Sequence, residues 1–257
     1  MEDSRREILN QVAQGVLTPE EAAARLDELG RGPTATAVGA ITKVRVVTNF
    51  GITEVLGDAA VQEAVADGPH VARREGDTLV IESDDVQEGL TGFYFGRSAG
   101  AASVFMGYGQ RPPKLLVRMN PQLALSLSCA AGKVSVTGVK GPVRAEVAAG
   151  SVVINGFSGP IDISTMTGSV SASGVLDHGE SRVRCETGKV AIHLARGSDV
   201  RVAGRATLGR VGLPGERTAG RLIDGGRREV TVGSGKATLE VEANVGKVEV
   251  TAEDESR

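Results

Sequence analysis

The sequence predicts a mainly β protein, a parallel β-solenoid (β-helix) with a short N-terminal α-helical hairpin. The first observation is a series of glycines at an interval of nine residues: Gly132, Gly141, Gly150, Gly159 and Gly168. The residues two, four and seven places after each glycine are all apolar. A fixed short period of this kind indicates stacked strands that bury an apolar face only against their neighbours. Aromatic residues make up only 3 % of the chain, which suits a narrow interior of small β-branched side chains.

Residues 1–32 are predicted to form the helical hairpin. Thr18-Pro19-Glu20-Glu21 provides an N-cap, a proline in the first turn and a capping-box glutamate for its second helix. The apolar stripe consists of Ile8, Leu9 and Val12 in the first helix and of Ala22, Leu26 and Leu29 in the second. This stripe is too small for an independent core. We therefore expect the hairpin to dock on the rest of the chain, pair with a copy of itself or hold a protein partner.

Residues 33–40 are a predicted linker of small and turn-forming residues, and residues 41–257 are the predicted β-repeat domain. Val44 and Val46 alternate with charged residues, as in a half-buried strand, and a second strand with Leu79 and Ile81 on one face is expected after the turn-like Glu75-Gly76-Asp77. The stretch 50–75 between them is less regular, and we expect it to cap the stack.

Residues 89–113 form an aromatic and glycine-rich insertion in this domain. Five of the seven aromatic residues of the chain lie in it: Phe93, Tyr94, Phe95, Phe105 and Tyr108. Long loops in compact domains are often functional. Two interpretations stay open, an exposed apolar binding patch or an end cap that covers the strand edges of the solenoid.

The nine-residue units predict how the strands stack. Residues two and four places after each glycine are expected to face inward, and residue seven to point inward again after a bend. The glycine is expected at the corner, where positive φ or close backbone approach is needed. Among the five repeat glycines, only Gly141 and Gly159 are followed by proline. The predicted coil is therefore eighteen residues long, with Val134, Val152 and Val170 in one inner ladder. An antiparallel meander is the alternative; the inward seventh residue favours the solenoid.

Beyond Gly168 the pattern slips by two residues and resumes at Gly188. Residues 214–228 are an irregular excursion. Looser apolar pairs close the series: Val200/Val202, Val211/Leu213, Val230/Val232, Leu239/Val241 and Val248/Val250.

Two parts of the chain resemble known bacterial families. RREILNQVAQGVLTPEEAAARLDEL, from Arg5 to Leu29, resembles the N-terminal helical hairpin of the YvlB/LiaX group, and its T-P-E-E-A piece is similar to the SHOCT-type hairpin. The repeats at Gly132-Lys133-Val134, Gly168-Ser169-Val170 and Gly188-Lys189-Val190 resemble the strand repeats of the domain of unknown function labelled "putative adhesin". The resemblance covers nearly the whole chain except the aromatic insertion. It implies a β-solenoid and a link to cell-envelope stress, and it brings no catalytic residues.

Composition restricts the classes of partner and compartment. The net charge of −3 indicates no nucleic-acid binding. The two cysteines, Cys129 and Cys185, form no CxxC motif, which favours a reducing compartment. The N-terminus lacks a signal-peptide pattern, and no stretch approaches about 18 apolar residues. We therefore expect a cytoplasmic protein, with peripheral contact with the membrane as an option.

Three groups of residues match a catalytic, phosphate-binding or metal-binding motif only in part. Gly96–Gly100 matches GxSxG, but the strand and helix that this motif needs are missing around it. Gly233–Lys236 is similar to a phosphate-binding loop, but Ala237 replaces the Ser/Thr that would hold magnesium, so we interpret it as a turn between strands. His193 and Cys185 lack a second close pair of metal ligands, so we interpret them as a surface histidine and a core cysteine.

Residues 196–228 are strongly basic, with eight arginines against three acids. The arginines are Arg196, Arg201, Arg205, Arg210, Arg217, Arg221, Arg227 and Arg228. A solvated outer face that discourages edge pairing is the favoured interpretation. Contact with an anionic membrane surface or polymer is the alternative.

The leading hypothesis is a non-enzymatic scaffold or regulatory binding protein linked to bacterial cell-envelope stress, without a cofactor, metal site or small-molecule substrate. Protein partners or self-association are expected through Ile8, Val12, Leu26, Leu29, Phe93, Tyr94, Phe95, Phe105 and Tyr108. A self-polymerising protein similar to bactofilins is the first alternative. A polysaccharide-acting β-helix enzyme is the second, although the outward positions show no evident pair of acids.

Overall fold

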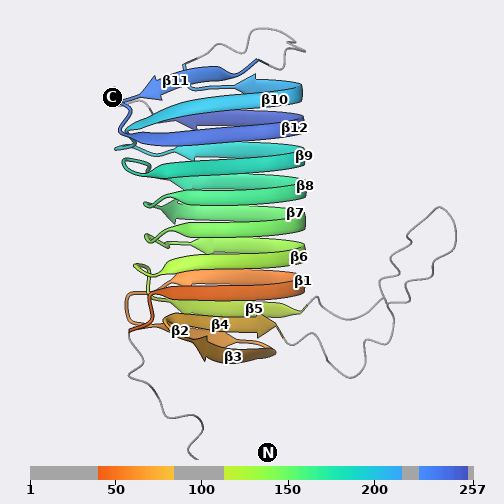
Figure 1. The fold of residues 1–257 in the computed structure, drawn as a ribbon, viewed down its shortest axis with the longest axis vertical. Coiled ribbons are helices and arrows are strands. Elements are labelled where there is room, and N and C mark those ends of the chain that lie inside the picture. The colour runs from red at the N-terminus through yellow and green to blue at the C-terminus, as the bar shows by residue number, and fades with distance from the viewer. Residues whose placement is uncertain (1–39, 84–112, 216–225, 254–257) are drawn as a thin grey trace, which may run out of the picture. The chain divides into compact units, whose positions relative to one another are not determined.

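A computed structural model describes residues 40–83, 113–215 and 226–253 of the chain. These residues are mainly β, and no helix occurs among them (Figure 1). The helical hairpin predicted at 1–32 and the insertion up to residue 112 lie outside the described residues. So do all nine predicted partner-binding residues: Ile8, Val12, Leu26, Leu29, Phe93, Tyr94, Phe95, Phe105 and Tyr108.

The described residues form twelve strands. They are β1 (Lys43–Gly57), β2 (Ala64–Asp67), β3 (His70–Glu75), β4 (Thr78–Ser83), β5 (Lys114–Met119), β6 (Ala124–Thr137), β7 (Val143–Phe157), β8 (Ile161–Gly174), β9 (Glu180–Leu194), β10 (Val200–Gly212), β11 (Arg228–Val232) and β12 (Ala237–Ala252). They pair in the order β11-β10-β12-β9-β8-β7-β6-β1-β4-β3, while β5 pairs with β1 and β2.

The long strands pair in parallel with the interval that the sequence predicts. Val134 pairs with Val152, and Val152 with Val170, so β6, β7 and β8 are each offset by eighteen residues. Gly168 pairs with Gly188, which is the predicted slip of two residues between β8 and β9. The parallel register contradicts the alternative of an antiparallel meander for these strands.

Each long strand bends at a glycine, and these glycines lie in register. We call this column the glycine ladder; in the order of the sheet it consists of Gly51, Gly132, Gly150, Gly168, Gly188, Gly246 and Gly209. At Gly150 the backbone has φ +136°, and a Cβ there would lie 1.9 Å from the carbonyl oxygen of Gly132. Only glycine fits this approach of neighbouring backbones. The predicted corner role is thus confirmed at Gly132, Gly150, Gly168 and Gly188, whereas Gly141 and Gly159 lie between strands and not in this column.

β4 and β5 pair with the two halves of the same strand, β1. β4 pairs with Lys43–Val47 in the first half of β1, and β5 pairs with Ile52–Gly57 in its second half. β4 and β5 therefore pair with β1 as the two halves of one bent strand would.

The interior is a continuous column of apolar side chains, and one prediction about it was wrong. The residues two and four places after the repeat glycines are buried, as expected: Val134, Val136, Val143, Ala145, Val152, Ile154, Ile161, Ile163, Val170 and Ala172. At the seventh place Val139 and Phe157 are buried, but Ala148 is exposed and Met166 is 63 % exposed. The pairing of β7 with β8 skips Ala148 and Met166, because each lies in the kink two residues before a ladder glycine. The two nine-residue halves are therefore not equivalent.

Two strands lie out of sequence order. β1 lies between β6 on one side and β4 and β5 on the other, and β12 lies between β9 and β10 (Figure 1). The apolar pairs of β12 therefore do not extend the stack beyond β10 and β11. Short antiparallel strands lie at both ends of the sheet, with β3 on β4, β2 on β5 and β11 on the first half of β10.

Candidate binding surface

An open groove of about 720 Å³ crosses the outer face of the strand halves that precede the glycine ladder. Residues of β1, β6, β7, β8 and β9 line it. On this face the residues four and six places before a ladder glycine point outward, because side chains alternate along a strand. Those of β7, β8 and β9 supply its charged lining: Arg144, Glu146, Asp162, Arg182 and Arg184.

The floor of the groove is made of small side chains beside one large apolar one. Ser128, Ala130, Ala148 and Ser164 line it, and Met166 is 63 % exposed. Ala148 and Met166 are the kink residues described above, which explains why apolar side chains face outward there. A flexible thioether on a surface of small residues can contact differently shaped apolar groups.

Charges of both signs alternate across the groove. Arg144 Nη2 lies 2.8 Å from Glu146 Oε1, and Arg144 Nη1 lies 3.8 Å from Asp162 Oδ2. These two carboxylates, Glu146 first, raise the pKa of Arg144. Arg182 and Arg184 each lie 3.0 Å from a carboxylate of β12, those of Glu240 and Glu242. The groove therefore presents a mixed pattern of charge.

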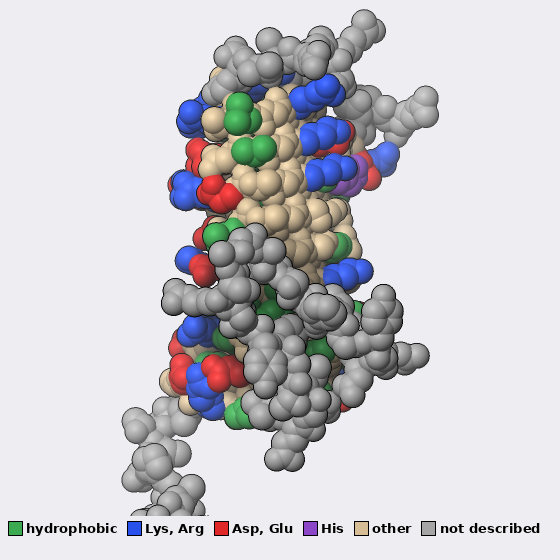
Figure 2. All heavy atoms as spheres, turned by 90° about the vertical axis from the view of Figure 1, so that its right-hand side faces the viewer, with side chains coloured by type: hydrophobic (Ala, Val, Ile, Leu, Met, Phe, Trp, Pro, Cys, Tyr) green, Lys and Arg blue, Asp and Glu red, His purple; other side chains and the backbone are tan. Residues whose placement is uncertain are grey.

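The face that bears the glycine ladder differs from the groove. Figure 2 faces the bend of the strands, and its upper half shows an uncharged central column with charged side chains along both flanks. Residues just before the ladder glycines add single exposed apolar side chains, namely Phe50, Val245 and Leu208. The charged groups thus lie beside the bend and not on it.

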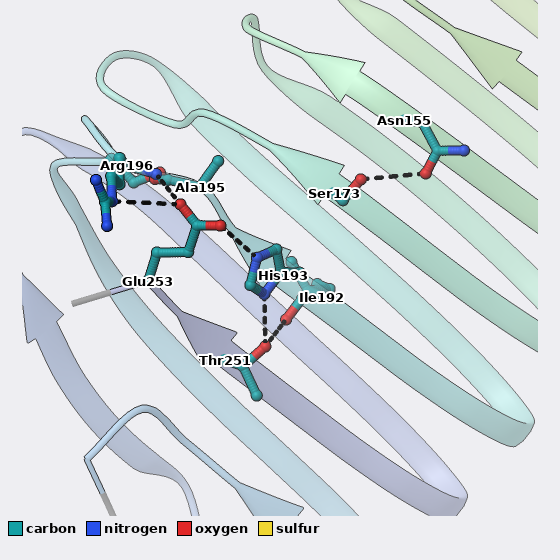
Figure 3. A network of polar contacts seen from close by, with 9 residues as sticks. Asn155, Ser173, Ile192, His193, Ala195, Arg196, Thr251 and Glu253 are labelled. Carbon is teal, nitrogen blue, oxygen red and sulfur yellow. Dashed lines mark hydrogen bonds and ion pairs between the residues drawn. The ribbon is translucent and has the colours of Figure 1, made fainter.

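A polar network lies on the strand halves that follow the glycine ladder (Figure 3). His193 Nδ1 lies 3.0 Å from Thr251 Oγ1, and His193 Nε2 lies 3.4 Å from Glu253 Oε1. The backbone N–H of Arg196 donates to Glu253 Oε2 at 3.3 Å. These two contacts, that of His193 first, lower the pKa of Glu253. The network ties the end of β12 to β9.

His193 and Cys185 do not form a metal site. His193 is exposed on the outer face, whereas Cys185 is 2 % exposed and belongs to the interior. Among the described residues no group of three His, Cys, Asp or Glu side chains is close enough to hold a metal ion. The interpretation as a surface histidine and a core cysteine agrees with this placement.

The Gly233–Lys236 segment is a turn between β11 and β12, as predicted. Asp199, at the end of the connection from β9 to β10, accepts hydrogen bonds from Ser234 Oγ at 2.7 Å and from the Gly235 N–H at 2.5 Å. These contacts, the Ser234 hydroxyl first, lower the pKa of Asp199. The glycines and the serine therefore serve the turn and its contact with Asp199.

Acids of β11, β12 and the residue after β12 pair with part of the arginine-rich stretch. Arg227 Nε lies 2.9 Å from Glu229 Oε1, its Nη1 lies 3.5 Å from Glu240 Oε1, and Arg196 Nε lies 3.8 Å from Glu253 Oε2. Arg217 and Arg221 lie outside the described residues. This pairing supports the interpretation of the stretch as a solvated outer face.

The groove was not predicted from the sequence, although a signal for it is present. Arg144, Asp162 and Arg182 occupy the same outward column on three neighbouring strands. Opposite charges on adjacent strands attract each other. Their eighteen- and twenty-residue spacing thus marks a charged outer column. These residues keep the repeat, so an interruption of the repeat does not reveal them.

No family model matches the chain, and no curated protein matches it significantly. Among solved structures it is similar to the crystal structure of a putative cell adhesion protein from Clostridium sporogenes ATCC 15579. The identity is 13 %, the match covers 84 % of this chain and 94 % of that chain, and the TM-score is 0.45. Within the described ranges there is no helix of the length and hydropathy required to cross a membrane.

Proposed function

We propose that the chain is a parallel β-solenoid that acts as a non-enzymatic binding scaffold and holds a protein partner in the groove. The observation that carries the proposal is the groove itself, which extends over five strands and presents both charges beside an exposed methionine.

The solenoid is supported by the register and by the corners. Eighteen-residue parallel offsets bring equivalent residues of successive layers together. The glycine ladder then bends each layer at the same place. Each layer of such a stack contacts only its neighbours, so the outer surface grows regularly with the number of layers. Extended regular surfaces of this kind are used for binding in repeat proteins.

A protein partner suits the groove better than a polyanion does. Nucleic acids and anionic lipids select for basic patches, whereas Glu146 and Asp162 place two carboxylates among the three arginines. Exposed ion pairs such as Arg144–Glu146 stabilise the fold little, so they can exchange partners at low cost. A partner segment with charges of both signs and an apolar residue for Met166 fits this pattern. The proposed role in cell-envelope stress rests on the family resemblance alone.

The test uses the full chain as bait in lysates of stressed and unstressed bacteria. A protein recovered with the wild type is identified, purified and titrated against the groove variant Arg144→Glu/Arg182→Glu. We expect this variant to bind about tenfold more weakly, the loss typical of a misplaced interface charge. The matched control is Lys133→Glu/Lys189→Glu, which also reverses two positive charges, but on the strand halves after the glycine ladder. An equal loss in both variants, or none in the groove variant, would refute the assignment.

End-to-end polymerisation is less well supported. Stacking of parallel copies requires free edges of the parallel strands at both ends. Antiparallel strands cover these edges on both halves at one end, as β3 and β2 do, and β11 covers one half at the other. Light scattering that shows growth of filaments with concentration would favour this alternative over a simple binding scaffold.

A further inference from the structure

β12 occupies a slot between two strands that follow one another in the sequence. β9 ends at Leu194 and β10 begins at Val200, yet these strands do not pair with each other. β12 pairs in parallel with β9 along one edge and with β10 along the other. The stack is therefore complete here only when a strand from elsewhere in the chain enters the slot.

The outer surface of the slot is basic, and β12 supplies the acids. Glu242 lies opposite Arg184 on β9 and opposite Arg205 on β10. Glu240 Oε2 lies 3.0 Å from Arg182 Nη2, and its Oε1 lies 3.5 Å from Arg227 Nη1. Glu242 thus separates two arginines of the walls, and Glu240 neutralises Arg182 of β9 and also Arg227, which precedes β11.

Direct pairing of β9 with β10 would bring like charges together. With the ladder residues Gly188 and Gly209 in register, Arg184 would stand opposite Arg205, the two arginines that Glu242 separates when β12 is in place. Like charges directly opposite each other destabilise neighbouring strands. The slot therefore does not close well on its own, and it favours an acidic strand between its walls.

The inward face of β12 completes the core in the same slot. Val241 and Val248 are fully buried, Val250 is 2 % exposed, and Gly246 continues the glycine ladder. The slot thus selects a strand by three criteria. These are apolar residues at alternate positions, a glycine at the corner and glutamates on the outside.

From these contacts we infer that the slot accepts β12 of a second copy of this chain, so that two copies exchange this strand. The exchanged strand makes every contact that it makes within one chain, and exchange of identical elements costs little for that reason. β12 is connected to β11 by one short turn, in which Gly233 has φ +70° and Gly235 has φ +77°. Such glycines can change conformation more easily than other residues, which makes the turn a suitable hinge. This inference concerns the copy-to-copy contact and does not depend on the partner proposed for the groove.

Disulfide trapping between two full-length variants tests the exchange. Arg184 and Glu242 are register partners, so Arg184→Cys on one copy and Glu242→Cys on another come together only when β12 crosses between copies. Parallel neighbours lie about 4.8 Å apart, which is within the range that a disulfide spans. The two variants are mixed, warmed below their unfolding temperature and oxidised. Arg144→Cys mixed with Asp162→Cys is the control, because these partners lie on β7 and β8, which the proposal leaves within one chain.

We expect the first mixture to give about tenfold more covalent heterodimer than the control mixture, since the exchange of β12 alone would differ between them. Equal yields overturn the inference. The double variant Arg184→Cys/Glu242→Cys must form a disulfide between these two positions, within one chain or between exchanged copies, and failure to form either overturns the inference as well. If Arg184→Cys does not fold, Ala191→Cys mixed with Glu249→Cys provides a second pair of register partners on β9 and β12.

Discussion

Asp199 and Gly235 are joined across thirty-six positions of the sequence by a hydrogen bond of 2.5 Å from the Gly235 N–H to the Asp199 carboxylate. The carboxylate is only 18 % exposed, and Lys236 Nζ lies 3.3 Å from it. Asp199 immediately precedes β10, and Gly235 lies in the turn that leads into β12. This contact therefore holds the entry of β12 beside the start of β10.

Asp199→Ala should destabilise the fold by removing this contact. The N–H of Gly235 and the hydroxyl of Ser234 would lose their acceptor, and the turn would no longer be held to the start of β10. We expect a clear fall in the urea midpoint of unfolding and faster hydrogen exchange in β12. Asp162→Ala is the matched control, because Asp162 makes only one exposed contact of 3.8 Å with Arg144. Equal midpoints for the two variants would contradict the role of Asp199.

The contribution of Asp199 should depend on pH in a defined direction. Its pKa is lowered in the folded state by the Ser234 hydroxyl and the backbone N–H groups of the turn. Stability from such a group is fully present above the unfolded pKa of about 3.9 and is lost as pH falls toward the folded value. The stability difference between wild type and Asp199→Asn should therefore be constant near neutral pH and shrink below about pH 4. Urea midpoints measured at pH 7 and pH 3 check this; a gap that widens in acid would be inconsistent with it.

Gly150→Ala should disrupt the glycine ladder. The added Cβ would lie 1.9 Å from the carbonyl oxygen of Gly132, and the backbone has φ +136°. Because a rigid neighbouring backbone blocks the methyl group, we expect a loss of about 3 kcal/mol or more in the free energy of unfolding. Gly76→Ala is the control: φ is +62° there, but no atom lies within 4 Å of the new Cβ. Its cost should be about 1–2 kcal/mol. Chemical denaturation of both variants measures the two losses of unfolding free energy. Equal losses would mean that Gly150 is an ordinary turn glycine and is not required by the close approach of the neighbouring backbone.

The sequence predicts the pairing of two strands where the strands have similar sequences, and it does not where they only have matching apolar residues and charges. The interval from Val134 to Val152 repeats itself, so the parallel register of β6 to β8 is visible in the sequence. The prediction that the seventh residue of each nine-residue unit points inward was wrong in part. Phe157 and Met166 are both apolar, but only Phe157 is buried. Periodicity cannot distinguish these two positions. The kink before a ladder glycine occurs in only one of the two nine-residue halves of each eighteen-residue repeat, the half that contains Met166.

The position of β12 could not be deduced from periodicity. Its apolar residues would fit beside any long strand of the stack, and sequential strands are usually neighbours. Glu240 and Glu242 match Arg182 and Arg184 in spacing, and this charge pattern was the available signal. The groove was missed for a related reason, because its charged residues keep the repeat instead of interrupting it.

The cysteines should be inert in the folded protein. Cys129 is 3 % exposed and Cys185 is 2 % exposed, and burial raises the pKa of the Cys185 thiol. A buried thiol that stays protonated reacts slowly with disulfide reagents. We expect no rapid thiol titration in native buffer and two thiols per chain in urea, the number of cysteines in the sequence. Rapid reaction of the native protein would mean that the interior opens near β6 or β9.

Charge reversal should show that Glu242 lies between two arginines. Arg184→Glu places two glutamates together, and Glu242→Arg places an arginine between Arg184 and Arg205, so each change should lower the melting temperature. For an isolated pair, the double variant Arg184→Glu/Glu242→Arg would restore stability. Here it should restore only part of it, because the new arginine on β12 would still face Arg205.

The size of these effects should identify them as surface electrostatics. Exposed pairs of this kind contribute about 0.2–1 kcal/mol each, and salt screens them. Thermal unfolding of the four proteins at low and high salt therefore measures the coupling directly. Full restoration by the double variant would mean that Arg205 does not contact the side chain at the Glu242 position. It would contradict the placement of Glu242 opposite Arg205. Partial restoration that disappears in high salt is the result expected of an acidic strand held between two basic walls.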